Sequence, residues 1–572
     1  MTRKFLVFAC LVLLMPKSDA QKYDYNWVLG RGATAGDLLQ FGDYNLHISK
    51  IDKTLPFYAT NTCISDTSGS LAFSFNGIKI QNRLHQLMAV TEGLSLGILA
   101  SLYNSSGAPT NQGSMALPIP GSPDRFRLFY WDNHPIYLSP DTPYTAPLHL
   151  YMAIIDLSAN NGQVVEKNIL VAADTFANAG IDAVKHANGR DWWIIVPEMR
   201  SNRYHTILVS PTGIDTTFVQ ASGAVWPPFV DITTQSCFSS DGTKFIRFND
   251  EVGLQVFDFD RCTGLFFNAK LVPFEFNNGY FCSASISYNA RFAFVTDLRA
   301  AWQYDLTASD IGATKTLIAK YDGYQNPNHC DFYLAKLAPD GKIYMNSWGG
   351  CKNLHVIEYP DRQGSACNLR QHAVPLFTYT EIGLPNLPNF RLGPLDGTNC
   401  DTLGLDNIPV AAFRGDVAGL DVDFTDLSWY NPTTWFWELG DGETSIERSP
   451  IHSYLVPGAY PVCLTVSNPF GTSKYCRTVS VGFSNLSEPD ARQLILFPNP
   501  GKESLEISLP FHDPGPVWVT LVSSTGQVLY TEKMKPAEGN LDVPVHSLPN
   551  GLYICRVSNG KKTLSKAFSV MH

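Results

Sequence analysis

Short runs in which apolar and polar residues alternate, separated by glycine, proline and asparagine, fill most of the chain. Alternation with a period of two is typical of β-strands that bury one face, and the apolar spacing expected for helices is almost absent. The best helical candidate, residues 306–321, is short. The pattern therefore predicts an all-β protein.

Four segments of the N-terminal region repeat one arrangement, in which a turn pair precedes a strand of aromatic and β-branched residues, and a second strand follows. The turn pairs begin 53, 48 and 51 residues apart. A repeat of about 50 residues that holds several short strands is typical of the blades of a β-propeller. The turn pairs are Asn188-Gly189, Asp241-Gly242, Asn289-Ala290 and Asp340-Gly341.

Two earlier segments, residues 64–82 and 120–132, resemble further copies of this unit. A seventh blade would be formed if segments near 27–48 and 377–392 joined, which is a usual way to close the ring. We therefore predict a seven-bladed β-propeller. A stack of β-sandwiches is the alternative.

The first repeat also contains a polar cluster of His186, Arg190 and Asp191, which we considered as a binding or catalytic site. Asn188-Gly189 takes the place of the other turn pairs, where a tight turn needs a positive φ angle. The other repeats supply no matching set of partners. The pattern favours a turn that leads into a strand over a catalytic site.

The composition changes after Cys400, and two smaller blocks of alternating strands follow. Their size and turn signals predict two immunoglobulin-like β-sandwich domains. The fold class is therefore all-β, a propeller followed by two sandwiches. The predicted organisation is a signal peptide at 1–20, a β-propeller at 21–398, a linker at 399–408, a sandwich at 409–483, a linker at 484–493 and a second sandwich at 494–572.

The signal peptide is predicted from Arg3 and Lys4, an apolar run at 5–15 and a small-residue cleavage site at 18–20. The run is shorter than the roughly 20 residues of a membrane-spanning helix. No later segment is long and apolar enough, so we expect no membrane span in the mature chain. The formal net charge of -10 makes nucleic acid an unsuitable partner.

Export would place the cysteines where disulfide bonds persist. The chain has 12 cysteines, and removal of Cys10 with the signal leaves an odd number. Their spacing does not suggest a zinc site, and Cys555 is our first choice for the unpaired thiol. A turn after residue 468 places Cys463 opposite Cys476, within disulfide reach. Sequence alone leaves the connectivity open. The candidate pairs are Cys463 with Cys476, Cys262 with Cys282, and Cys351 with Cys367.

The segment "WFWELGDGETSIERSPIHSYLVPGAYPVCLTVSNPFG" closely resembles the PKD domain family. The final block resembles the C-terminal sorting domain of the type IX secretion system and ends, like that family, in a lysine-containing strand. The matching PKD residues are Trp437, Gly440 to Gly442, Pro450, His452, Tyr454 and Pro457-Gly458. The matching sorting-domain residues are Phe497, Pro498, Asn499, Pro500, Ser524 to Gln527 with Gly526, and Leu548 to Tyr553 with Gly551.

This resemblance implies a cargo protein that engages the type IX secretion machinery and crosses the outer membrane. The mature protein is then expected at the cell surface or in the extracellular space. The propeller region is similar to large regions often found ahead of these two domains, and that similarity implies no activity.

No motif of a hydrolase, metalloprotease or nucleotide-binding enzyme is present, so the sequence does not identify an enzyme. Asp421, Asp423 and Asp426 were considered for calcium, but aspartates at a strand end are more often a solvated edge. No cofactor is predicted.

The favoured hypothesis is an exported binding or adhesion protein with a glycan or protein ligand. In it the propeller is the binding platform and the PKD domain is a spacer or interaction module. The alternative is a secreted enzyme that degrades polysaccharide or peptide at the mouth of the propeller channel.

Overall fold

The computed structural model describes residues 22–42, 45–89, 91, 93–132, 134–139, 142–158, 161–178, 180–226, 234–275, 281–482, 494–497, 501–509, 516–523, 527–536, 540–559 and 563–570. Nearly all of the regular structure in these ranges is β-strand, and the short helix α1 (Ile98–Leu102) is an exception. The predicted signal peptide lies outside the described residues, as do Pro498, Asn499, Pro500 and Gly526 of the sorting motif.

The described residues of the first domain form seven successive antiparallel sheets and one small hairpin. The first three sheets are β1 to β3 (Asn26–Leu29, Ala35–Gln40, His47–Asp52), β4 to β6 (Thr62–Ser65, Leu71–Phe75, Ile80–Asn82), and β7, β8, β11 and β12 (Ser114–Ile119, Ser122–Trp131, His149–Asp156, Gln163–Ala173). The next two are β13 to β16 (Asp182–Lys185, Trp192–Pro197, Arg203–Ser210, Gly213–Ala221) and β17 to β20 (Gln235–Phe238, Lys244–Asn249, Gly253–Asp260, Leu265–Val272). The last two are β21 to β24 (Ser283–Ile286, Phe292–Thr296, Ala300–Asp305, Thr316–Lys320) and β25 to β28 (Ala335–Leu337, Ile343–Met345, Cys351–Ile357, Leu369–Thr380). The hairpin is β9 and β10 (His134–Ser139, Thr142–Ala146).

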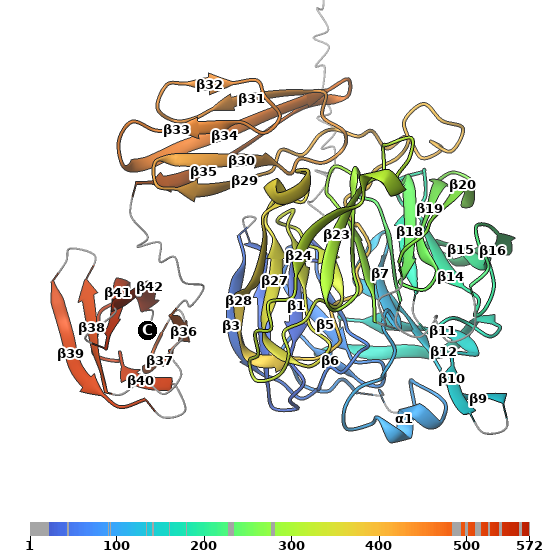
Figure 1. Ribbon diagram of the computed structural model, residues 1–572, viewed down its shortest axis with the longest axis horizontal. Coiled ribbons are helices and arrows are strands. Elements are labelled where there is room, and N and C mark those ends of the chain that lie inside the picture. The colour runs from blue at the N-terminus through green and yellow to red at the C-terminus, as the bar shows by residue number, and fades with distance from the viewer. Residues whose placement is uncertain are drawn as a thin grey trace, which may run out of the picture.

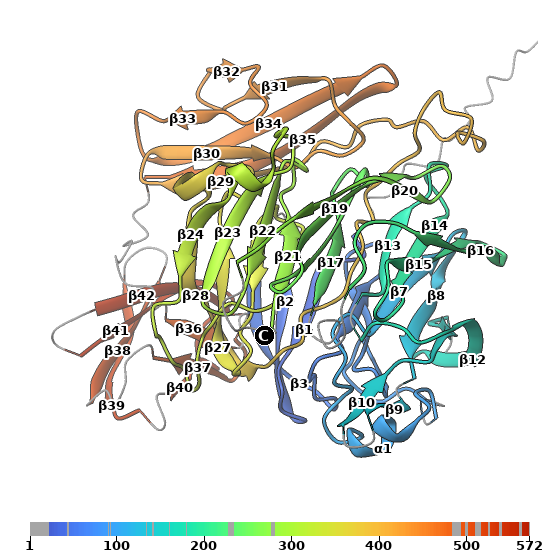
Figure 2. The ribbon, with the colours of Figure 1, turned by 45° about the vertical axis from the view of Figure 1, so that its right-hand side comes forward.

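The first strands of successive sheets lie beside one another, as contacts of β1 with β4, of β4 with β7, and along the series β13, β17, β21 and β25 indicate. Strand β28 of the last sheet contacts β2 and β3 of the first sheet, which closes the ring. The first domain is therefore a β-propeller (Figure 1). Helix α1 and the β9–β10 hairpin lie at the end of the propeller away from the second domain (Figure 2).

The repeated turns have the backbone conformation that their sequence predicts. Gly189, Gly242 and Gly341 have φ angles of +75°, +71° and +76°, and Ala290 has a φ of +59°. A side chain at Gly189 would place its Cβ 2.5 Å from the backbone nitrogen of Pro394. Glycine is therefore needed there both for the turn and for the close approach of another segment.

The helical candidate at residues 306–321 was wrong. This segment contains a 3₁₀ turn at Gly312–Thr314 and then β24, which pairs with β23 as the outer strand of its sheet. The backbone groups of 316–320 find partners on β23, and the β-branched residues Thr316 and Ile318 suit a strand. Pairing within the sheet therefore overrides a weak helical pattern.

The segments expected to close the ring do meet, but strand pairing is not what joins them in the described residues. Residues 377–380 belong to β28, which pairs with β27. The buried carboxylate of Asp37 on β2 accepts hydrogen bonds from the backbone N–H of Phe377 and Thr378 at 2.7 and 3.0 Å. Asp37 thus joins the first sheet to the last.

After β28 the chain passes through the centre of the propeller and leaves at its other end. The side-chain nitrogen of Asn386 donates to the carbonyls of Ser114 and Ile181 at 3.0 and 2.8 Å, and its backbone N–H donates to the carbonyl of Asn61 at 2.9 Å. Lys336 donates to the carbonyl of Leu387. One extended segment therefore bonds to sheets on different sides of the central channel and fills it.

The second domain is a two-sheet sandwich packed around the fully buried Trp437. Val462, Leu464 and Val466 alternate along one strand and point into the same core. One sheet contains β29, β30 and β33 (Phe413–Ala418, Asp421–Asp426, Ile451–Ser453), and the other contains β32, β31, β34 and β35 (Thr444–Ser445, Thr434–Glu438, Gly458–Asn468, Gly471–Val481).

The third domain has a similar division into two sheets around a separate core that contains Tyr553 and Cys555. It touches the propeller through the rings of Phe377 and Phe497, whose centroids are 5.9 Å apart. The sheets are β36, β37 and β40 (Ile495–Phe497, Ser504–Ser508, Asn540–Pro544) and β39, β38, β41 and β42 (Val528–Met534, Val517–Ser523, Gly551–Ser558, Thr563–Val570).

Three disulfide bonds form among the described residues, and two of them correct the predicted pairs. Cys463 bonds to Cys476, directly opposite it in the β34–β35 register. Cys262 bonds to Cys400 rather than to Cys282, and Cys351 bonds to Cys330 rather than to Cys367. The predictions assumed partners within one repeat, but the fold brings the linker after the propeller against the β19–β20 turn.

More than one cysteine of the described chain is a free thiol. Cys555 is free and buried, and burial raises its pKa to about 12, so it stays protonated and inert. The other free cysteines are Cys63, Cys237, Cys282 and Cys367.

Replacing both Cys463 and Cys476 by serine is expected to lower the stability of the second domain by about 2–3 kcal/mol, because the bridge restricts a short loop of the unfolded chain. Thermal unfolding of the double variant, followed by near-ultraviolet circular dichroism, measures the loss. A cysteine-to-serine change at the free Cys367 is the control. An unchanged unfolding temperature in the double variant would refute the prediction.

Candidate functional site: a cleft between the propeller and the second domain

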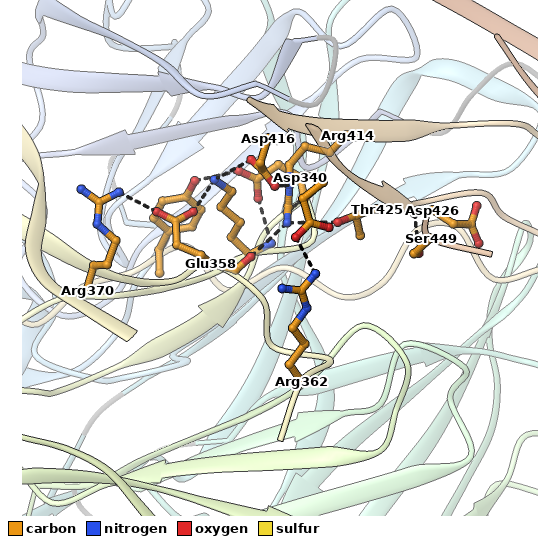
Figure 3. A network of polar contacts seen from close by, with 12 residues as sticks. Asp340, Glu358, Arg362, Arg370, Arg414, Asp416, Thr425, Asp426 and Ser449 are labelled. Carbon is orange, nitrogen blue, oxygen red and sulfur yellow. Dashed lines mark hydrogen bonds and ion pairs between the residues drawn. The ribbon is translucent and has the colours of Figure 1, made fainter. Parts of the chain in front are cut away.

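The second domain docks on one end of the propeller through the buried side chain of Arg414 on β29 (Figure 3). The Arg414 side chain is only 2% exposed. It donates to the backbone carbonyls of Asp340 and Glu358 on the propeller, and its Nε pairs with Asp416 at 2.8 Å. A planar guanidinium suits this site because its donors point in several fixed directions.

Other charged side chains surround this contact. Glu358 accepts from Lys342 and, at 3.0 Å, from Arg370, whose side chain is 49% exposed. Arg362 of the propeller pairs with Asp423 of the second domain at 2.5 Å. These ion pairs cross or border the interface, so the two domains are held in one orientation.

Beside this interface lies a cleft of about 290 Å³. Its walls combine aromatic rings with amide, carboxylate and guanidinium groups, some from the propeller and some from the second domain. The propeller contributes Ser240, Asp241, Tyr288, Asn289, Ala290, Asn389, Arg391 and Leu392, and the second domain contributes Ser428, Trp429, Tyr430, Asn431, Pro432, Trp435 and Arg448.

The loop between β30 and β31 forms one wall of the cleft. Tyr430 and Asn431 have φ angles of +63° and +49°. Residues other than glycine and asparagine rarely adopt such positive φ angles. Trp435 follows at the start of β31, and the guanidinium of Arg448 lies 5.6 Å from its ring centroid. The strained backbone turns the tyrosine and asparagine toward the propeller, where both line the cleft.

Arg391, on the segment that leaves the channel, forms the floor together with Trp429. Its guanidinium makes two 2.6 Å bonds to Asp24 and lies 5.2 Å from the Trp429 ring centroid. Burial opposes the charge of Arg391, but Asp24 outweighs this effect and raises the pKa of the guanidinium above its usual value. The floor is therefore a permanent ion pair beneath an indole ring.

The side chains that line this cleft can stack and form hydrogen bonds. Aromatic faces provide stacking surfaces, and the exposed side chains of Asp241, Asn289 and Asn431 provide hydrogen-bonding groups. The lining residues named above include no histidine or cysteine, and Asp241 is their one carboxylate.

The central channel of the propeller leaves a much smaller cavity than the cleft between the two domains. A cavity of about 70 Å³ remains beside the chain segment that fills it. Asp182 and Lys336 line this cavity; burial raises the pKa of Asp182 to about 7 and lowers that of Lys336. The cavity holds water-sized molecules but is smaller than the roughly 300 Å³ at which ligand sites usually begin.

The predicted cluster in the first repeat forms a turn. His186 accepts the backbone N–H of Asn188 on Nδ1 at 3.0 Å and donates from Nε2 to the carbonyl of Cys262 at 3.1 Å. Arg190 pairs with its neighbour Asp191 at 2.7 Å. Burial lowers the pKa of His186, which therefore stays neutral. These three side chains hold the turn between β13 and β14.

The three aspartates considered for calcium have separate partners. Asp421 accepts from the hydroxyl of Ser453 at 2.6 Å, Asp423 pairs with Arg362, and Asp426 pairs with Arg448 at 3.0 Å. These carboxylates stabilise the second domain and its interface with the propeller, and they do not point toward one shared position.

Residues 407–482 match the PKD domain family, and residues 495–571 match the secretion system C-terminal sorting domain family. The chain is a cargo of the type IX secretion system. The sorting domain directs such cargo across the outer membrane to the cell surface or the extracellular space. In the part of this cargo that the structure describes, no helix has the length and hydrophobicity needed to cross a membrane.

The PKD domain of this cargo is similar to part of the pre-pro-metalloprotease PrtV of Vibrio cholerae, with 37% identity over 14% of this chain. The matched region is 9% of the length of that protease. The solved PKD1 domain of PrtV shares 35% identity over 13% of this chain and 95% of that chain, with a TM-score of 0.13. A functionally unknown protein from Desulfotomaculum acetoxidans covers 70% of this chain and 92% of its own at 8% identity, with a TM-score of 0.29.

The sequence did not reveal the cleft. Its walls come from the β17–β18 and β21–β22 turns, the channel segment and the β30–β31 loop, which are far apart in the chain. One signal was present, since Trp429, Tyr430 and Trp435 gather in a short stretch of the PKD domain. Their location against the propeller could only come from the docked structure.

Proposed function

We propose that this cargo is an exported glycan-binding protein and that the cleft between the propeller and the PKD domain is its binding site. The observation that carries the proposal is the combination, in one cleft of about 290 Å³, of aromatic rings and unlike polar groups. Sugar rings present apolar faces that stack on indole and phenol rings, and hydroxyl groups that bond to amides, carboxylates and guanidinium groups. Both kinds of partner line this cleft.

In this proposal the PKD domain is part of the binding site rather than a spacer alone. It supplies Trp435, Tyr430 and Arg448, while the propeller supplies Asp241 and Asn289. The buried contact of the PKD domain with the propeller sets the distance between these walls. A ligand would therefore meet a preformed site and would lose little binding energy to reorganisation of the protein.

The alternative, a degrading enzyme with its site at the channel mouth, has less support. The channel is filled by the protein's own chain around Asn386. The volume of the cleft suits a small ligand better than a folded protein, since a stable protein interface buries about 800 Å² on each partner.

Replacing Trp435 by alanine is expected to weaken glycan binding about tenfold, because a stacked aromatic contact contributes up to about 1.5 kcal/mol. Phe436 is the matched control, since it is the next residue on β31 and its side chain is 44% exposed. Successive residues of a strand face opposite sides, so the Phe436→Ala change leaves the cleft intact.

The experiment is a glycan array screened with the secreted chain, followed by titration calorimetry of each hit and mass spectrometry of the recovered glycan. We expect intact glycan, weaker binding by Trp435→Ala and unchanged binding by Phe436→Ala. Absence of any glycan hit, or equal binding by both variants, would contradict the proposal. Shortened glycan products would instead favour the enzyme.

A further inference from the structure

Three side chains that the proposed glycan site does not use meet near the opposite end of the propeller. Asp174 directly follows β12, Glu198 directly follows β14, and His205 lies on β15. The backbone N–H of Asp174 donates to the carbonyl of Leu148 at 3.0 Å, just after the β9–β10 hairpin. That hairpin lies at the end of the propeller away from the PKD domain (Figure 1).

Backbone pairing fixes the three side chains relative to one another. Phe176 and Glu198 form an isolated antiparallel bridge, and the N–H of Met199 donates to the carbonyl of Thr175 at 2.9 Å. His205 pairs with Val196 in the β14–β15 ladder. The ring of Phe176 packs edge-on against the His205 imidazole, with centroids 5.0 Å apart.

The donor atoms have the spacing of ligands around one metal ion. Nε2 of His205 lies 3.1 Å from Oε1 of Glu198 and 3.3 Å from Oδ2 of Asp174, and one donor atom from each residue lies within 4.8 Å of the others. With metal–ligand bonds of about 2.0–2.2 Å, neighbouring ligands in tetrahedral or octahedral geometry lie roughly 3.0–3.5 Å apart. Both distances from Nε2 fall in this range, so small movements of the carboxylates would complete a ligand set.

Two carboxylates share one imidazole nitrogen in this cluster. Nε2 of His205 carries at most one hydrogen, yet two carboxylate oxygens approach it, both farther than the roughly 2.7–2.9 Å of a strong charged hydrogen bond. The Glu198 and His205 side chains are only 7% and 9% exposed, so water compensates little of the charge.

Arg203 supplies a positive charge beside the two carboxylates. Its guanidinium lies 3.4 Å from Oε1 of Glu198, and its side chain is 53% exposed. It is therefore free to move toward solvent when another cation takes its place.

We propose that Asp174, Glu198 and His205 bind a divalent transition-metal ion, of which Zn²⁺ is the best match. One imidazole nitrogen and two carboxylate oxygens are ligands that Zn²⁺ accepts, whereas Ca²⁺ takes oxygen ligands alone. Asp174 is 39% exposed, so the remaining coordination positions face solvent and are open to water or an anionic group. This site is separate from the glycan cleft and does not depend on it.

The test is calorimetric titration of the tag-free secreted chain with ZnCl₂ in a buffer without chelators. We expect one ion per chain and at least a tenfold loss of affinity in Asp174→Asn and in Glu198→Gln, since even outer ligand contacts are worth about 10–100-fold. Asp174→Asn is the decisive variant because its exposed side chain can change without disturbing the core.

His372→Asn is the matched control. His372 pairs with a single carboxylate, Asp322, at 2.9 Å. Replacing it should therefore leave the Zn²⁺ affinity of the chain unchanged. Arg203→Gln should increase Zn²⁺ affinity because it removes the competing cation, whereas a merely structural ion pair would predict only lower stability. No stoichiometric binding, or equal affinity in the parent chain, Asp174→Asn and Glu198→Gln, would overturn the proposal.

Discussion

Replacing Arg414 by methionine is expected to release the PKD domain from the propeller and to remove about 3–5 kcal/mol from the stability of the docked state. The side chain is 2% exposed and bonds to the carbonyls of Asp340 and Glu358 and to Asp416. Methionine fills a similar volume but cannot donate. The carbonyls of Asp340 and Glu358 would then lose this donor at a buried contact, while Asp416 would keep Lys342 at 3.5 Å.

Small-angle X-ray scattering and limited proteolysis of the linker measure this release. The Arg414→Met variant should have a larger radius of gyration and faster cleavage between residues 399 and 408. The matched control is Arg370→Met, in the same polar network but 49% exposed, which should cost less than about 1 kcal/mol. Unchanged scattering in Arg414→Met would refute the role assigned to this residue.

The Arg414→Met variant also tests whether the glycan cleft needs both domains. If the PKD domain forms one wall, the released variant should lose glycan binding together with compactness. Binding that persists after release would place the ligand on one domain alone.

Replacing Asn386 by alanine is expected to lower the stability of the propeller by about 2–6 kcal/mol. The side-chain amide donates to the buried carbonyls of Ser114 and Ile181 and accepts from Gln112 at 3.3 Å. An unsatisfied buried carbonyl costs about 1–3 kcal/mol, and two would be left. The loss is large because one buried side chain bonds both to β7 and to the segment that leads into β13.

Denaturant unfolding followed by tryptophan fluorescence measures this loss. Asn389→Ala is the matched control, because Asn389 lies on the same segment, is half-buried and donates to one carbonyl, that of Ser240. Its effect should be clearly smaller. Equal unfolding midpoints for the parent chain and Asn386→Ala would show that the segment merely occupies the channel.

The repeated strands and turns could be predicted because they depend on short stretches of sequence. A turn such as Asp340-Gly341 followed by alternating apolar residues selects its conformation from neighbours in the chain, and Gly341 has the expected φ of +76°. The pairing of Cys463 with Cys476 could also be predicted, because the register of a hairpin follows from the position of its turn.

Longer-range pairings did not follow from such reasoning. Cys237 and Cys282 lie much nearer to Cys262 along the chain than Cys400, which is 138 residues away, and only the path of the linker selects Cys400. Similarly, residues 316–320 form a strand because β23 offers an unpaired edge. In both cases the deciding partner is distant in sequence, so local propensity carries no information about it.

The sequence by itself determined the all-β class, the repeats of the propeller, the PKD and sorting domains and the export route that the sorting domain implies. These properties reside in periodicity, turn residues and family motifs, each of which lies within a short stretch. The tertiary structure decided that the channel is filled by the chain, that Arg414 fixes the PKD domain, and that Trp435 faces the propeller. It also brought together Asp174, Glu198 and His205. The cleft and this cluster are made where separate elements pack, so they exist only after the chain has folded.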